Sequence, residues 1–73
     1  MEDKRLEKAI IFLHDEYENW RNTWMIAGDF NPSTIEALGR VMAAEEMISK
    51  LWNMEVNEVN MMRIAWECEH IPA

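Results

Sequence analysis

The amino-acid sequence predicts an all-α fold: an antiparallel helical hairpin plus a shorter third helix, assembled into a dimeric helical bundle. Apolar residues recur at alternating spacings of four and three over the first 27 residues, and a second set with the same spacing follows a Gly-to-Pro interruption. More apolar side chains then remain than one hairpin can cover. We expect a single domain, because the chain has only 73 residues.

The first predicted helix spans about residues 3–27. Asp3 is a suitable N-cap, and Gly28 stands just past the last apolar position, where a helix commonly ends. The regular spacing places the apolar residues on one face, so that face is expected to pack against another helix. The stripe consists of Leu6, Ile10, Leu13, Tyr17, Trp20, Trp24 and Ala27.

The second predicted helix spans about residues 32–52. Asn31 and Pro32 provide an N-cap and a proline at the first helical position, while Ser33 and Glu36 offer an overlapping capping box. The short connection predicts that the first two helices are antiparallel. Small residues of the second helix should then face the aromatic end of the first. The second stripe consists of Ala37, Val41, Ala44, Ile48 and Leu51.

The third predicted helix spans about residues 55–68. Asn53, Asn57 and Asn60 form helices weakly and favour a break near residues 53–57. The alternative, one continuous helix through this region, stays open because the apolar stripe also continues from Trp52. That third stripe consists of Val56, Val59, Met62 and Trp66.

The apolar residues left over after pairing the stripes predict self-association. Exposed apolar patches above a few hundred Å² commonly mark an interface, so we expect a homodimer or a higher symmetric oligomer. Trp20 and Trp24 are expected in the core, whereas Trp52 and Trp66 are expected to anchor an interface. The seven methionines suit an adaptable binding surface. The predicted partner or oligomer interface consists of Ile11, Phe12, Met25, Leu38, Met42, Trp52, Met62 and Trp66.

Composition narrows the function classes. The net charge of −7 is spread along the chain without a basic face, so we do not expect direct nucleic-acid binding. The single Cys68 cannot form an internal disulfide, which is typical of a reduced compartment. No apolar run approaches the ~20 residues that a membrane helix needs. We expect a cytoplasmic protein with no membrane association.

Signals of catalysis are sparse, and we expect no enzyme activity, cofactor or bound metal. His14 and Glu18 lie four residues apart and are expected on a solvated, charged helix face. Such a pair could hold one edge of a metal site, but zinc needs further ligands. The run Glu67-Cys68-Glu69-His70 also groups atoms that can bind a metal, but Cys-x-His alone is a weak signal near a chain end. Glu55-x-x-Glu58 resembles half of the magnesium motif of MazG-like pyrophosphohydrolases; their second motif, E-x-x-D, does not follow.

The sequence therefore predicts a small acidic interaction protein that binds and regulates, most simply inhibits, a larger protein. Short acidic helical chains of this kind are frequent in phages and mobile elements. Two alternatives stay open. An oligomeric sponge for a small nucleotide would use Tyr17, Trp20 and Arg21, and a dimeric nucleic-acid-associated regulator would use the basic cluster at residues 4–8.

Overall fold

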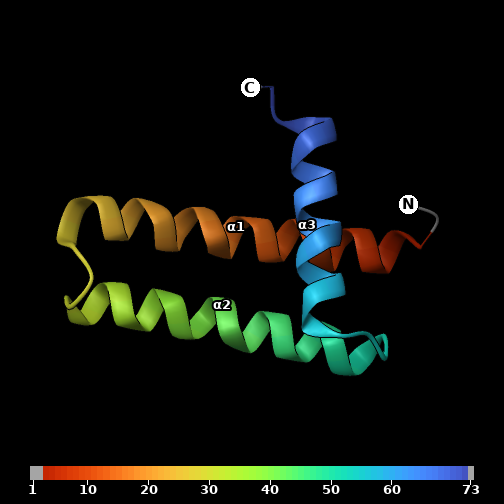
Figure 1. Cartoon of the computed structure of the whole chain (residues 1–73), viewed down its shortest axis with the longest axis horizontal. Helices are drawn as coiled ribbons and strands as arrows, with labels where there is room; N and C mark the ends of the chain where they lie inside the picture. The colour runs from red at the N-terminus through yellow and green to blue at the C-terminus, as the bar shows by residue number, and fades with distance from the viewer. Residues whose placement is uncertain (1–2, 73) are drawn as a thin grey trace.

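The computed structural model describes residues 3–72, and within them the chain is all-helical, with three helices and no strand (Figure 1). These are α1 (Lys4–Ala27), α2 (Pro32–Leu51) and α3 (Val56–His70). The predicted all-α class is confirmed. The observed third helix begins one residue later and ends two residues later than the predicted range of 55–68.

Local side-chain chemistry sets the helix boundaries. The Asp3 carboxylate accepts hydrogen bonds from the backbone N–H groups of Arg5 and Leu6 at 2.9 and 3.2 Å, and so begins α1. Gly28 ends α1 with φ 81° and ψ 179°, a backbone conformation that is essentially restricted to glycine. Asn31 caps α2 by accepting from the N–H of Ser33 at 2.9 Å.

A tight turn separates α2 from α3. Asn53 takes the left-handed backbone conformation, with φ 52°, which asparagine tolerates better than most residues. The N–H of Met54 donates back to the carbonyl of Ser49 at 2.9 Å, and the Ser49 hydroxyl donates to the Met54 carbonyl. The structure therefore has the break that the asparagines favour, and the continuous helix is not formed.

In Figure 1, α1 and α2 lie side by side and run in opposite directions, and α3 crosses them steeply. The crossing lies near the N-terminal half of α1 and the C-terminal half of α2. The core is concentrated there, because only that half of the helix pair is covered by a third helix. Its buried cluster consists of Leu6, Ile10 and Leu13 of α1, Val41, Ala44 and Ile48 of α2, and Val59 of α3.

The end of the α1–α2 pair near the loop has no such cover, which leaves the predicted core residue Trp24 exposed. Leu51, the last residue of α2 at the opposite end, is a second predicted core position that is wrong. Gly39 does not mediate a close approach either, since a Cβ atom there would meet no atom within 4 Å. Helical periodicity places residues on a face, but the position of α3 decides how much of that face is buried.

Candidate protein-interaction surface

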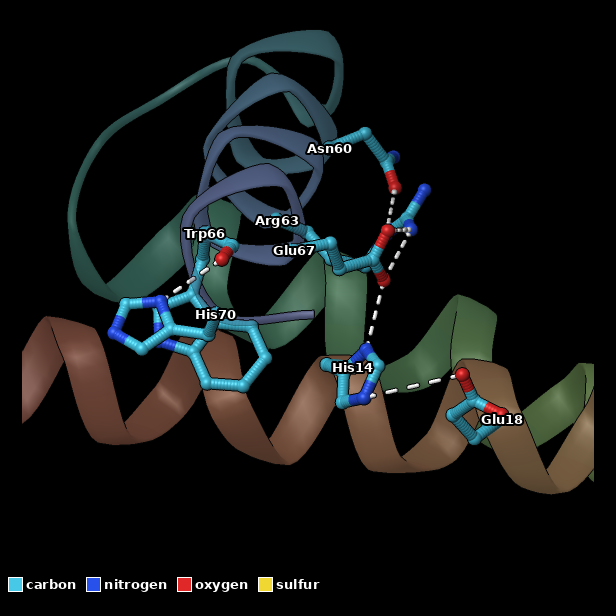
Figure 2. Close-up of polar contacts among 7 residues, drawn as sticks. All are labelled: His14, Glu18, Asn60, Arg63, Trp66, Glu67 and His70. Atoms are coloured by element: carbon cyan, nitrogen blue, oxygen red, sulfur yellow. Dashed lines mark hydrogen bonds and ion pairs between the residues drawn. The ribbon is translucent and has the colours of Figure 1, made fainter. Parts of the chain in front are cut away.

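A polar cluster of His14, Arg63 and Glu67 joins α3 to α1 (Figure 2). His14 Nδ1 lies 2.8 Å from Glu67 Oε2, and this nitrogen is the donor because an ionised carboxylate only accepts hydrogen bonds. One nitrogen of the Arg63 guanidinium group donates to both Glu67 oxygens, at 2.9 and 2.8 Å. Glu67 therefore accepts hydrogen bonds from α1 and from its own helix.

The cluster keeps Glu67 ionised although the side chain is largely enclosed. Burial alone would raise the pKa of the carboxyl group, but hydrogen bonds from His14 and Arg63 outweigh it and hold the pKa below its usual value. The Arg63 side chain is only 9% exposed. Its guanidinium carbon lies 3.8 Å from the centre of the Tyr17 ring, so a cation–π contact adds to the attachment of α3.

Aromatic and amide contacts extend this cluster. The Trp66 ring lies 5.1 Å from the His14 ring, tilted by 48°, and stacks on His70 with ring centres 4.6 Å apart. Asn60 of α3 donates a hydrogen bond to Glu45 of α2. Polar contacts therefore tie α3 to both other helices and fix the place where it crosses them.

Sequence reasoning missed this cluster. His14 was expected on a solvated face, but it is 8% exposed and buried under α3. Two features of the sequence hinted at the cluster. His14 directly follows Leu13 of the first stripe, and Val59, Arg63 and Glu67 follow one another at four-residue spacing on one helix face. Neither signal gives the crossing angle, and the angle brings residues 53 positions apart into contact.

The cluster is better suited to fastening a helix than to holding a metal. Glu18 Oε1 lies 4.0 Å from His14 Nε2, and these two side chains alone supply fewer ligands than the three or four protein side chains that zinc requires. In the part of the chain that the structure describes, no three His, Cys, Asp or Glu side chains gather into a potential metal site. The same region contains no helix with the length and apolar character that crossing a membrane requires.

The structure divides the predicted interface residues into two groups. Trp52, Met62 and Trp66 pack against the core, partly buried within the single chain. Ile11 is half-buried. The indole of Trp52 also donates to Asp3 at 3.1 Å, which lowers the pKa of that carboxyl group. These tryptophans therefore attach elements of this chain to one another. The four that remain exposed are Phe12, Met25, Leu38 and Met42.

A further exposed apolar group, which we call the tip surface, surrounds the loop between α1 and α2. Its members all fall in residues 24–35, which include the loop and the helix ends beside it, so they share one end of the molecule. The Trp24 indole is held there by a hydrogen bond to Asp29. Ile26 and Phe30 are the most open, at 88% and 92% exposed. The tip surface consists of Trp24, Met25, Ile26, Phe30 and Ile35.

The side chains named for the two alternative functions are arranged less favourably. Arg63 covers one face of the Tyr17 ring, and Trp20 packs against Tyr17 in a T-shaped arrangement at 6.0 Å, so Tyr17 is already engaged within the chain and less open to base stacking. Lys4, Arg5 and Lys8 are exposed on the first turns of α1. They are few for a chain whose net charge is −7.

Comparison of the chain with known protein families, curated proteins and solved structures found no match.

Proposed function

We propose that this protein is a small interaction protein that pairs with a second copy of itself and, as a dimeric helical bundle, binds and regulates a larger protein. The observation that carries the proposal is the number of large apolar side chains that the three described helices leave exposed. Monomeric proteins seldom expose contiguous apolar patches larger than a few hundred Å².

The total surface supports an association of ordinary size. The accessible surface is 5390 Å², whereas a compact monomer of 8.7 kDa is expected to expose about 4,700 Å². The excess of roughly 600–700 Å² is close to the ~800 Å² that each partner contributes to a standard interface. Burial of one standard interface would therefore reduce the accessible surface of this chain to about the value expected for a compact monomer of its mass.

For the larger partner, we propose docking at the tip surface. Trp24 and Phe30 have the character of interface anchors, since aromatic side chains dominate binding energy when they enter a pocket. The chain as a whole is acidic, with a net charge of −7, whereas the two acids and two bases of residues 21–40 balance near the tip. A partner with an apolar pocket is complementary to these anchors, and a basic surface outside the pocket is complementary to the acidic remainder of the chain.

Self-association is tested by light scattering on the full chain over a range of concentrations. We expect a mass of about twice the 8.7 kDa of the chain at micromolar concentration. A monomer throughout that range would overturn the dimer.

The larger partner is tested by comparing Phe30→Asp with Met61→Asp, an equally polar change at an exposed residue of α3. A partner captured by the wild-type protein should be lost with Phe30→Asp and kept with Met61→Asp, while both variants keep the wild-type mass. Equal capture by both variants would refute docking at the tip.

A further inference from the structure

A groove of about 350 Å³ runs between α1 and α2, on the side away from α3. Phe12 precedes His14 by two residues, and Met47 follows Glu45 by two. Two residues turn an α-helix by about 200°, so Phe12 and Met47 point nearly opposite to the residues that contact α3. The groove is lined by Phe12, Glu16, Arg40, Ala43, Ala44 and Met47.

The apolar part of the groove is shaped for another side chain. Phe12 and Met47 flank it, 47% and 50% exposed, and Ala43 and Ala44 form a shallow floor. Large residues beside small ones create a surface on which a ring from another molecule can pack. Beyond Arg40 the same side of the pair becomes polar, where Asn19, Thr23 and Ser33 line a neighbouring hollow. The apolar contact is therefore limited to one half of this side.

The groove contains one acidic and one basic side chain, so its charges can match those of the same groove on a second copy of the chain. Glu16 and Arg40 line the same hollow with opposite signs. Glu16 Oε2 is enclosed and has no hydrogen-bond partner among the described residues. Arg40 donates to Glu36 through Nη2 at 3.0 Å and keeps further N–H groups for another acceptor. A two-fold axis through the groove would place Glu16 of one copy opposite Arg40 of the other, twice.

We propose that the groove is the dimer interface: a second copy of this chain docks there about a two-fold axis. Phe12 of each copy packs on the Ala43 floor and the Met47 side chain of the other, and two Glu16–Arg40 pairs flank the axis. The inference rests on the proposed self-association and assigns it to a surface. An isologous contact needs one surface to fit its own copy, and a hollow lined by an exposed ring and by side chains of both charge signs meets that requirement. The polar cluster that holds α3 lies on the other side and stays intact.

The first experiment measures the dissociation constant by sedimentation equilibrium on the full chain. Phe12→Lys should weaken the dimer by at least about tenfold, because it places a charge in the centre of the apolar contact. Met61→Lys, at an exposed position of α3 outside both the groove and the tip surface, is the matched control and should leave the dissociation constant unchanged. Circular dichroism checks that both variants keep their helices.

The second experiment exchanges charges. Glu16→Arg alone sets Arg against Arg across the axis, and Arg40→Glu alone sets Glu against Glu, so each variant should be largely monomeric at low salt. An equimolar mixture of the two variants restores both opposite-charge contacts and should form a 1:1 heterodimer.

The outcomes separate the two proposals. A wild-type monomer would remove both the self-association and the groove interface. A wild-type dimer that tolerates Phe12→Lys, or charge variants that gain nothing from mixing, would overturn the groove interface alone. In that case the proposed function would stand, with its self-contact elsewhere.

Discussion

The contact between Glu67 and Arg63 makes a sharp prediction about what holds α3 in place. Glu67→Ala removes the acceptor of two guanidinium hydrogen bonds, at 2.9 and 2.8 Å, and of the bond from His14 Nδ1 at 2.8 Å. Arg63, with its side chain 9% exposed, is left enclosed without an anion. Removing one partner of a fully buried ion pair costs about 3–5 kcal/mol.

The Glu67 side chain is 20% exposed, so water screens part of this effect. We therefore expect a loss of about 2–4 kcal/mol in the free energy of unfolding. This is a large share of the total, because a chain of this length has a stability of about 4–11 kcal/mol. Glu67→Gln keeps an acceptor oxygen and should lose less than Glu67→Ala.

The assay is urea unfolding at pH 7 and 25 °C, followed by tryptophan fluorescence, since Trp66 lies directly beside the cluster. With a denaturant slope of about 1 kcal/mol per M, the midpoint should fall by about 2–4 M. All variants are compared at one protein concentration, because the proposed dimer would make stability depend on concentration. Glu69→Ala, an exposed acid of the same helix, is the control and should stay within about 0.5 kcal/mol of wild type. Equal midpoints for the Glu67 and Glu69 variants would refute the reasoning.

Three further predictions follow from the structure. The folded-state pKa of Glu67 lies below its usual value of 4.5, so the stabilisation from this carboxylate is present above pH 4.5 and is lost as the pH falls through the lowered pKa. Urea midpoints measured from pH 6 down to pH 3 should therefore fall more steeply for the wild-type protein than for Glu67→Ala. Parallel curves would contradict this. Gly28→Ala should lower the free energy of unfolding by about 1–3 kcal/mol, because a φ of 81° strains an alanine. Gly39→Ala should raise it by up to about 1 kcal/mol, because the added Cβ atom meets open space and alanine favours the helix. Thermal unfolding measures both changes, and two changes of the same sign would contradict these assignments. Ile48→Ala, at a fully buried position, should lower the free energy of unfolding by about 2–5 kcal/mol, as measured by chemical denaturation. Ile26→Ala, at a position that is 88% exposed, should change it by less than about 0.5 kcal/mol. Similar losses for the two variants would contradict the observed core.

The candidate interaction surface could be predicted only in part from the sequence. Exposed Phe12, Met25 and Met42 were named because they fall outside the stripes, and they are exposed for that reason. Trp52 and Trp66 were named because tryptophan often anchors an interface, but α3 and the turn before it bring both against the core. Trp24 was expected in the core and is exposed, because α3 crosses the other half of the helix pair.

The sequence by itself determined the extent of α1 and the start of α2, and it favoured the break before α3 without deciding it. Their causes are local: the Asp3 and Asn31 caps act on backbone groups two or three residues away, Gly28 supplies its own backbone freedom, and the repeat of apolar residues needs only the 3.6-residue turn. Only the tertiary structure decided where α3 crosses. That crossing depends on how Val59 packs into the helix pair and on the partners that His14 finds 53 residues away, and no spacing along one helix encodes an angle between two. Because α3 covers one end of the pair, the same angle also decided which apolar side chains remain exposed for a partner.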